Sequence, residues 1–89
     1  MEIEFDTAKD ADNREKHGLS LAFGAWIFDD PDALILSTIR REDEEERYKV
    51  IGMVEGKLYT AVHVWRGESV RFISVRRSND SEEKAYHCD

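Results

Sequence analysis

The sequence predicts an α+β domain in which two N-terminal helices pack on a mainly antiparallel four-stranded sheet, with a short C-terminal helix. Apolar residues recur at helical spacing in the first third of the chain, whereas from residue 33 they follow the period of strands. Two Gly-containing dipeptides, Glu55-Gly56 and Gly67-Glu68, separate three strand-like runs, as in consecutive hairpins. A chain of 89 residues supports one hydrophobic core, so a single domain over residues 1–89 is expected.

The chain is expected to begin with a short edge strand and a capped helix. Residues 2–5 alternate polar and apolar side chains, which is typical of a strand. Asp6 is placed to cap a helix that runs to about Lys16-His17, because its carboxylate can accept from the first free N–H groups. Gly18 supplies the left-handed residue that commonly ends a helix.

A second helix is expected between Ser20, its cap, and Pro31, which disfavours helical geometry in the residue before it. Its apolar residues fall into one stripe at helical spacing. The stripe consists of Leu21, Ala25 and Phe28, with Ala22 and Trp26 beside it.

The remaining chain is predicted to form strands and a last helix. Ala33–Ile39 is a short apolar run, and Arg40–Arg47 is a loop too uniformly charged to pack. Tyr48–Val54 pairs with Lys57–Trp65, and Ser69–Arg77 follows around a type II′ turn with glycine first.

The C-terminal helix is predicted from its capping residues. Asn79 or Asp80 caps it, and Glu82 or Glu83 occupies the capping-box position three residues later. It is expected to end near Tyr86.

Two-residue loops sort the strand side chains onto two faces, because side chains alternate along a strand. A three-residue second loop would move the residues of the last strand to the opposite faces, and the two-residue loop is preferred because it gives the cleaner apolar face. The first face, the expected core beneath the helices, carries Ile51, Met53, Leu58, Val62, Val64, Ile73 and Val75. The second face is aromatic and half polar, with Tyr48, Tyr59, His63, Trp65, Ser74 and Arg76 beside Val50, Val54, Val70 and Phe72. Arg76 is thereby expected to lie among aromatic residues.

Composition excludes several classes of protein. A formal net charge of −7 argues against a protein that coats nucleic acid without discrimination. No stretch is long and apolar enough to span a membrane, and the acidic N-terminus lacks the basic start of a signal peptide. The single cysteine, Cys88, excludes an intramolecular disulfide framework, so a reducing cytoplasm is the expected compartment.

The bases are concentrated in one segment. Residues 57–77 carry five bases against Glu68 alone, whereas the rest of the chain has an excess of acids. Such a basic stripe fits a local anion site, and it also fits a solvated edge that is paired with neighbouring carboxylates.

The three histidines each allow two interpretations. His17 can act as a general acid or base, or can simply favour the dipole at a helix C-terminus beside Lys16 and Gly18. His63 can contact RNA or be a hydrogen-bonded residue of the sheet. His87-Cys88 lacks a second pair of metal ligands, so no metal and no cofactor are expected.

The segment Arg71–Ser78 carries most of the chemistry. Arginine stays protonated and presents a planar fork that matches phosphate oxygens. At the end of a strand, Arg76 can therefore hold a scissile phosphate, or alternatively can form salt bridges with the Glu42–Glu46 run.

Motifs spread from Phe5 to Tyr86 resemble the BrnT family of bacterial toxins. They are Phe5-Asp6, Lys9, Asn13, Lys16-His17-Gly18-Leu19-Ser20, Phe28-x-Asp30-Pro31, Glu46-Arg47, Ile51-Gly52, Gly56, Arg71-x-Ile73-Ser74-x-Arg76-Arg77 and Tyr86. The resemblance implies a RelE-like fold and a metal-independent ribonuclease toxin of a type II toxin–antitoxin pair. It also implies a BrnA-like ribbon-helix-helix antitoxin, through which alone operator DNA would be contacted.

The resemblance and the residue chemistry together suggest a set of site residues. For catalysis we expect Arg76 as phosphate clamp assisted by Arg47 or Lys49, His17, His63 or Glu46 for proton transfer, and Tyr86 as stacking residue or acid. For RNA binding we expect Lys49, Tyr59, Trp65, Arg71 and Arg77. The antitoxin is expected to cover Arg76, Tyr59 and Trp65, with the helical face as the alternative. The competing hypothesis is a non-catalytic or decayed toxin that only docks a partner protein.

Overall fold

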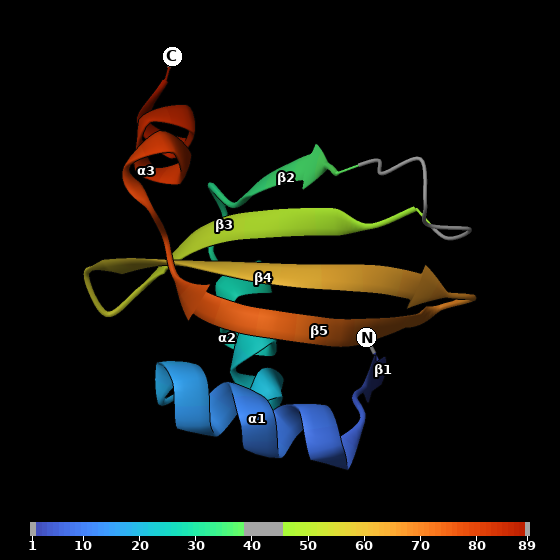
Figure 1. Cartoon of the computed structure of the whole chain (residues 1–89). Helices are drawn as coiled ribbons and strands as arrows, with labels where there is room; N and C mark the ends of the chain where they lie inside the picture. Colours follow the sequence, from blue (N-terminus) through green and yellow to red (C-terminus); the bar gives the residue numbers. More distant parts are fainter. Residues whose placement is uncertain (1, 39–45, 89) are drawn as a thin grey trace.

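The computed structural model describes residues 2–38 and 46–88, so most of the predicted loop Arg40–Arg47 lies outside the described residues. The described elements form three layers: α1 and α2 lie on one side of a sheet, and α3 lies on the other (Figure 1). In chain order they are β1 (Glu2–Glu4), α1 (Thr7–His17), the 3₁₀ helix η1 (Leu21–Phe23), α2 (Gly24–Phe28), β2 (Leu34–Ser37), β3 (Tyr48–Val54), β4 (Lys57–Arg66), β5 (Ser69–Arg77) and α3 (Asp80–His87). Among these residues, no helix is long and apolar enough to cross a membrane.

The sheet differs from the prediction because it has five strands and is mixed. Its order is β1-β5-β4-β3-β2, and β1 pairs parallel with β5 while the other pairs are antiparallel. The alternating pattern of residues 2–5 correctly predicted a strand at the edge. It carried no information on the partner, because a three-residue strand presents the same pattern to a parallel or an antiparallel neighbour.

The predicted caps of α1 and α3 and both two-residue turns are confirmed, whereas Ser20 caps the 3₁₀ helix η1 and not α2. The Asp6 carboxylate accepts from the N–H groups of Ala8 and Lys9, and Gly18 ends α1 with a left-handed φ of 71°. Both hairpins have two-residue loops, since Val54 pairs with Lys57 and Arg66 pairs with Ser69. The local sequence therefore determines where the strands begin and end.

The predicted assignment of residues to sheet faces is wrong beyond the middle of β5. Val62 pairs with Ser74 but His63 pairs with Phe72, so Ile73 is an extra residue in the ladder, a β-bulge. One inserted residue inverts the alternation of everything that follows it. Arg76 consequently shares a face with its partner Thr60, and Val75 takes the place among the aromatic residues that Arg76 was expected to occupy.

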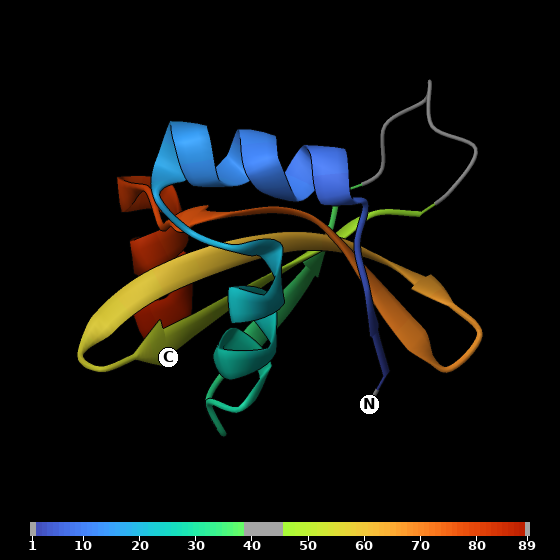
Figure 2. The same ribbon diagram turned by 90° about the horizontal axis from the view of Figure 1, so that it is seen from below.

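The aromatic face, and not the predicted aliphatic one, is the face that α1 and α2 cover (Figure 2). The buried residues that form the core cluster are Leu21, Ile27, Val50, Ala61, Val70, Phe72 and Val75. Two glycines allow α2 to approach closely: a Cβ at Gly24 would meet the Phe72 ring at 2.4 Å, and one at Gly52 would meet the Ile27 carbonyl oxygen at 2.5 Å. Since Arg76 lies on the opposite face from Tyr59 and Trp65, the three cannot form the single surface predicted for the antitoxin.

Asn13 of α1 supplies hydrogen-bond partners for the part of the β5 edge that no strand pairs with. Its side-chain amide donates to the Val75 carbonyl at 2.8 Å, and its side-chain oxygen accepts from the Val75 N–H at 3.1 Å. The same amide donates to the Leu19 carbonyl at 2.8 Å. These bonds satisfy a buried strand edge beyond the end of β1 and place the helix alongside β5.

Candidate functional site

Two of the predicted cations converge on one carboxylate, that of Glu82 in α3. The Arg76 guanidinium donates to both of its oxygens, at 2.6 and 2.8 Å, and Lys49 Nζ donates at 3.2 Å. The Thr60 hydroxyl donates to the same group at 3.1 Å. We call Arg76, Lys49 and Thr60 the Arg76 cradle, since three donors from three adjacent strands surround one oxyanion.

The local sequence explains why Glu82 reaches this position. Strand β5 ends at Arg77 and α3 begins at Asp80, so the third helical position lies six residues beyond Arg76. Glu82 also closes the capping box: its carboxylate accepts from the Asn79 N–H, and the Asn79 side chain accepts from the Glu82 N–H. The helix start thus fixes a carboxylate that faces the sheet.

The Glu82 carboxylate is ionised throughout the neutral pH range although its side chain is only 1 % exposed. Burial raises its pKa, but the hydrogen bonds from Arg76, the Asn79 N–H and Lys49 outweigh burial and lower the pKa to about 2. The hydrogen bond to Glu82 raises the pKa of Arg76 in return. Two cations face one carboxylate here, so the cluster retains an excess of positive charge.

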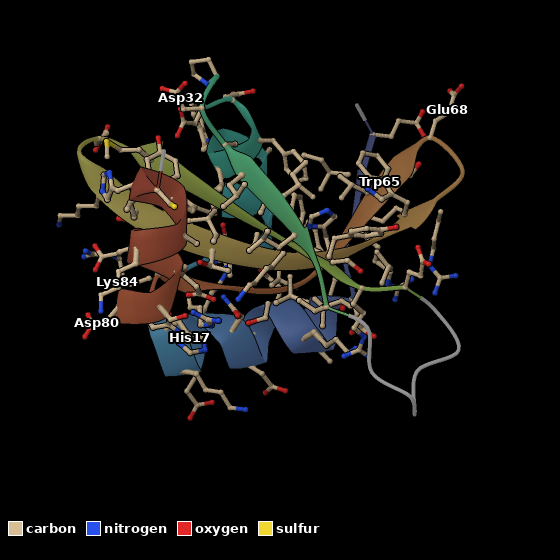
Figure 3. The ribbon with its side chains drawn as sticks, turned by 90° about the horizontal axis from the view of Figure 1, so that it is seen from above. His17, Asp32, Trp65, Glu68, Asp80 and Lys84 are labelled. Carbon is tan, nitrogen blue, oxygen red and sulfur yellow. The ribbon has the colours of Figure 1, made fainter. Side chains whose placement is uncertain are left out.

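His17 lies in a cavity of about 260 Å³ between α1 and β5. The cavity is also lined by Lys9, Lys16 and Ser74. Ser74 and Arg76 are two residues apart on β5 and therefore share one face, about 6–7 Å apart along the strand. Figure 3 shows His17 at the C-terminal end of α1, well separated from Trp65.

His63, in contrast, is fully buried in an aromatic cluster. Its ring centroid lies 4.9 Å from that of Phe28 and 6.2 Å from that of Phe72, and it stacks on Tyr48 at 5.9 Å. Its Nε2 has no hydrogen-bond partner among the described residues. Burial lowers the pKa of His63, so the ring is neutral and shielded from solvent.

The other predicted catalytic residues form hydrogen bonds with partners outside the Arg76 cradle. They are Glu46 and Arg47, which precede β3, and Tyr86 of α3. The Tyr48 hydroxyl donates to the Glu46 carboxylate. The backbone carbonyl of Arg47 accepts from the Thr38 N–H and hydroxyl, which joins β3 to the end of β2. The Tyr86 hydroxyl donates to Asp30 at 2.6 Å, which raises the pKa of Tyr86 to about 12 and keeps it protonated.

The predicted RNA-binding residues on β4 and β5 are likewise divided. The Arg77 guanidinium lies over the Tyr59 ring at 5.4 Å, on the face opposite the cradle. Trp65 is 45 % exposed near the β4–β5 turn. Asp6 has a lowered pKa, mainly through its bonds to the Ala8 and Lys9 N–H groups, and nearby Arg71 lowers it further.

Thr60 and Asp30 were not predicted as site residues from the sequence, and Glu82 was assigned only a capping role. The predicted alternative for Arg76 was a salt bridge with Glu42–Glu46; of that run the structure describes Glu46, which bonds to Tyr48, whereas Arg76 pairs with Glu82. The sequence contained part of the evidence for this ion pair. A capping-box glutamate that follows a strand-end arginine by a few residues lies close to that arginine in space.

The described side chains contain no group of three or more His, Cys, Asp or Glu that is placed to hold a metal ion. Metal independence remains a prediction about the reaction and is tested below.

The chain is similar to a known protein family. No curated protein matches the chain. A family model described as the ribonuclease toxin, BrnT, of a type II toxin–antitoxin system matches residues 5–82. This range includes α1, the whole of β2 to β5, and Glu82 at the start of α3. The chain therefore belongs to the BrnT family of ribonuclease toxins of type II toxin–antitoxin systems.

Proposed function

We propose that this chain is a metal-independent endoribonuclease that cleaves RNA in the cytoplasm and so inhibits translation and growth. We further propose that it is neutralised by a BrnA-like antitoxin, whose ribbon-helix-helix domain alone contacts operator DNA. The observation that supports the activity best is the Arg76 cradle, which holds an oxyanion by a bidentate guanidinium, an ammonium and a hydroxyl. A phosphodiester presents the same kind of oxygens, so Glu82 occupies the place of a phosphate.

The proposed chemistry needs a base and a positive site. The base removes the proton of the ribose 2′-OH, whose oxygen attacks the adjacent phosphorus while the bond to the 5′ oxygen breaks. The products are a 2′,3′-cyclic phosphate and a 5′-OH end, which takes up a proton. Arg76 and Lys49 stabilise the charge that develops on the phosphate oxygens. His17 is the candidate base that remains accessible, because it lines a cavity together with Ser74 of β5, whereas His63 is buried.

RNA must replace Glu82 in the cradle for this mechanism to operate. The carboxylate and a phosphate compete for the same donors, so α3 has to shift or Glu82 has to rotate away. Neutralising Glu82 removes the competitor while Arg76 and Lys49 remain. We therefore expect Glu82→Gln to bind RNA more tightly than the wild-type protein.

The activity is tested with purified protein and RNA in excess EDTA. Arg76→Gln should reduce the cleavage rate by about 10²–10³-fold, the usual effect of removing one group that stabilises transition-state charge. Arg14→Gln is the matched control, since it removes the same charge from an exposed side chain of α1 that has no predicted role in the site. The double variant Arg76→Gln/Glu82→Gln removes both partners and avoids an unpaired buried carboxylate. Undiminished cleavage by folded Arg76→Gln would reject the clamp, and loss of wild-type cleavage in EDTA would reject metal independence.

A second candidate function is a non-catalytic module that only docks a partner. It is favoured by the same contact, because Glu82 of the chain itself already accepts the two hydrogen bonds that Arg76 would donate to a phosphate. Expression in bacteria separates the two candidates. An active ribonuclease arrests growth until the antitoxin is co-expressed, whereas a docking module leaves growth unchanged.

A further inference from the structure

Trp26 is the most exposed large apolar side chain among the described residues. It is 63 % exposed on α2, although the adjacent Ile27 is completely buried against the sheet. Trp26 was predicted to lie beside the apolar stripe of this helix, and the close contact of α2 at Gly24 and Ile27 turns its side chain outward. An indole left in water on a small protein indicates a contact surface.

Two adjoining cavities surround Trp26. One, of about 520 Å³, extends over Pro31 and Met53 to Tyr86 of α3. The other, of about 170 Å³, is lined by Phe23 and Tyr59. Trp26, Val54 and Glu55 line both cavities, which therefore form one continuous surface. We call it the Trp26 groove.

The rim of the Trp26 groove is acidic. Asp29, Asp32 and Glu55 line it, together with Asp30, and no Lys or Arg is found among the described lining residues of either cavity. Asp32 lies on the loop between α2 and β2, at the outer edge of the molecule (Figure 3). The apolar floor is thus bordered by carboxylates, and the nearby cation Arg77 stacks over the Tyr59 ring at the other end of the groove.

The floor of the Trp26 groove is held in place by Asp30. Its carboxylate accepts from the Tyr86 hydroxyl at 2.6 Å, the Met53 N–H at 2.8 Å and the Asp32 N–H at 2.9 Å. These bonds connect the loop after α2 to β3 and α3. A surface fixed in this way loses little conformational entropy when a partner binds.

We propose that the Trp26 groove is the docking surface for the antitoxin, and that its occupant is a positively charged amphipathic segment of that protein. A bulky apolar side chain of the segment packs on Trp26 and Met53, and its Lys or Arg side chains face Asp29, Asp32 and Glu55. The inference rests on the proposed toxin–antitoxin function. Charge decides the occupant: the acidic rim repels RNA, anionic lipid and a second copy of this chain, whose net charge is −7.

Docking here also bears on the Arg76 cradle. Tyr86 lines the groove, while Glu82, one helical turn earlier in α3, occupies the cradle. A segment that packs against Tyr86 holds α3 against the sheet and thereby keeps Glu82 on Arg76. Inhibition then needs no contact with the cradle itself.

The probe for the test is the purified antitoxin, which is sought as the product of the open reading frame adjacent to the gene. Trp26→Ala is expected to weaken its binding by about 30-fold or more, as for a central aromatic anchor. Trp65→Ala is the matched control, because Trp65 is the other exposed tryptophan and lies away from the groove, and we expect a change of less than about 3-fold. Asp29→Asn/Asp32→Asn should slow association by about 10-fold at low salt and weaken its salt dependence. Circular dichroism confirms that each variant is folded.

Three results would overturn the inference: unchanged affinity of Trp26→Ala, greater loss with Trp65→Ala, or an unchanged association rate after the two Asp substitutions. Loss of self-association or of RNA binding in Trp26→Ala, without loss of antitoxin binding, would assign the groove to another occupant.

RNA cleavage measured in parallel keeps the two proposals apart. Trp26→Ala should cleave RNA at the wild-type rate but resist neutralisation. If the wild-type protein cleaves no RNA and Trp26→Ala still loses the antitoxin, the proposed activity fails and the docking surface stands. If cleavage occurs and Trp26→Ala is neutralised normally, the docking surface fails alone.

Discussion

Glu82→Gln should destabilise the protein at neutral pH, because Glu82 is ionised in a buried position that depends on its charge. The pKa of this carboxyl falls from its usual 4.5 to about 2 in the folded protein. About 2.5 pH units correspond to roughly 3 kcal/mol, and solvent screening of the partly exposed Arg76 and Lys49 reduces the expected loss to about 1–3 kcal/mol. Glutamine keeps the size of the side chain and an oxygen for the Asn79 and Thr60 bonds, so the charge is the main change.

The pH dependence gives the sign of this effect. The folded pKa lies below the unfolded one, so ionised Glu82 stabilises the protein above about pH 4.5. Its contribution disappears as the pH falls from there toward about 2. Urea unfolding at pH 7, 4 and 3 should therefore show a difference between wild type and Glu82→Gln that shrinks with acid.

Glu83→Gln provides the control, since it removes the same charge from the same helical turn without touching the Arg76 cradle. It should change the unfolding free energy by less than about 0.5 kcal/mol, as surface substitutions usually do. Equal stability of Glu82→Gln and wild type at pH 7, or equal losses for the two variants, would refute the reasoning.

Three further predictions concern buried groups. His63 is buried in its neutral form, so the unfolding free energy of the wild type should decrease as the pH is lowered from 6.5, by up to about 1.4 kcal/mol per pH unit. In urea titrations between pH 7 and 5, His63→Phe should lack this part of the pH dependence. Gly52→Ala should lower the free energy of unfolding by about 1–3 kcal/mol, measured by thermal unfolding, because the new Cβ meets the Ile27 carbonyl oxygen at 2.5 Å. An unchanged Tm would show that α2 moves freely. Asn13→Ala should cost about 2–3 kcal/mol, since it leaves the buried Val75 N–H and the Leu19 carbonyl unpaired, and faster amide exchange at Val75 is the specific readout.

The local features of this protein were determined by the sequence alone. Asp6, Gly18, Asn79 and the two turn dipeptides act on neighbouring backbone groups, so their roles are encoded within a few residues. For the same reason the limits of β3, β4 and β5 were predicted to within one residue, and the α+β class was predicted correctly. The family, too, was evident from motifs that lie along the chain from Phe5 onward.

Only the tertiary structure decided which face of the sheet is the core and what Arg76 contacts. The extra residue Ile73 in β5 inverts the alternation of side chains between the two sheet faces after it, and no local sequence pattern in β5 indicates this bulge. Next to the bulge, Asn13 of α1 bonds to both backbone groups of Val75, a contact across 62 residues. The bulge moves Arg76 to the face that α3 covers, where the capping-box carboxylate of Glu82 lies. A one-residue shift in register has no local signature but changes the partner of every later side chain, so the site depends on contacts between distant parts of the chain.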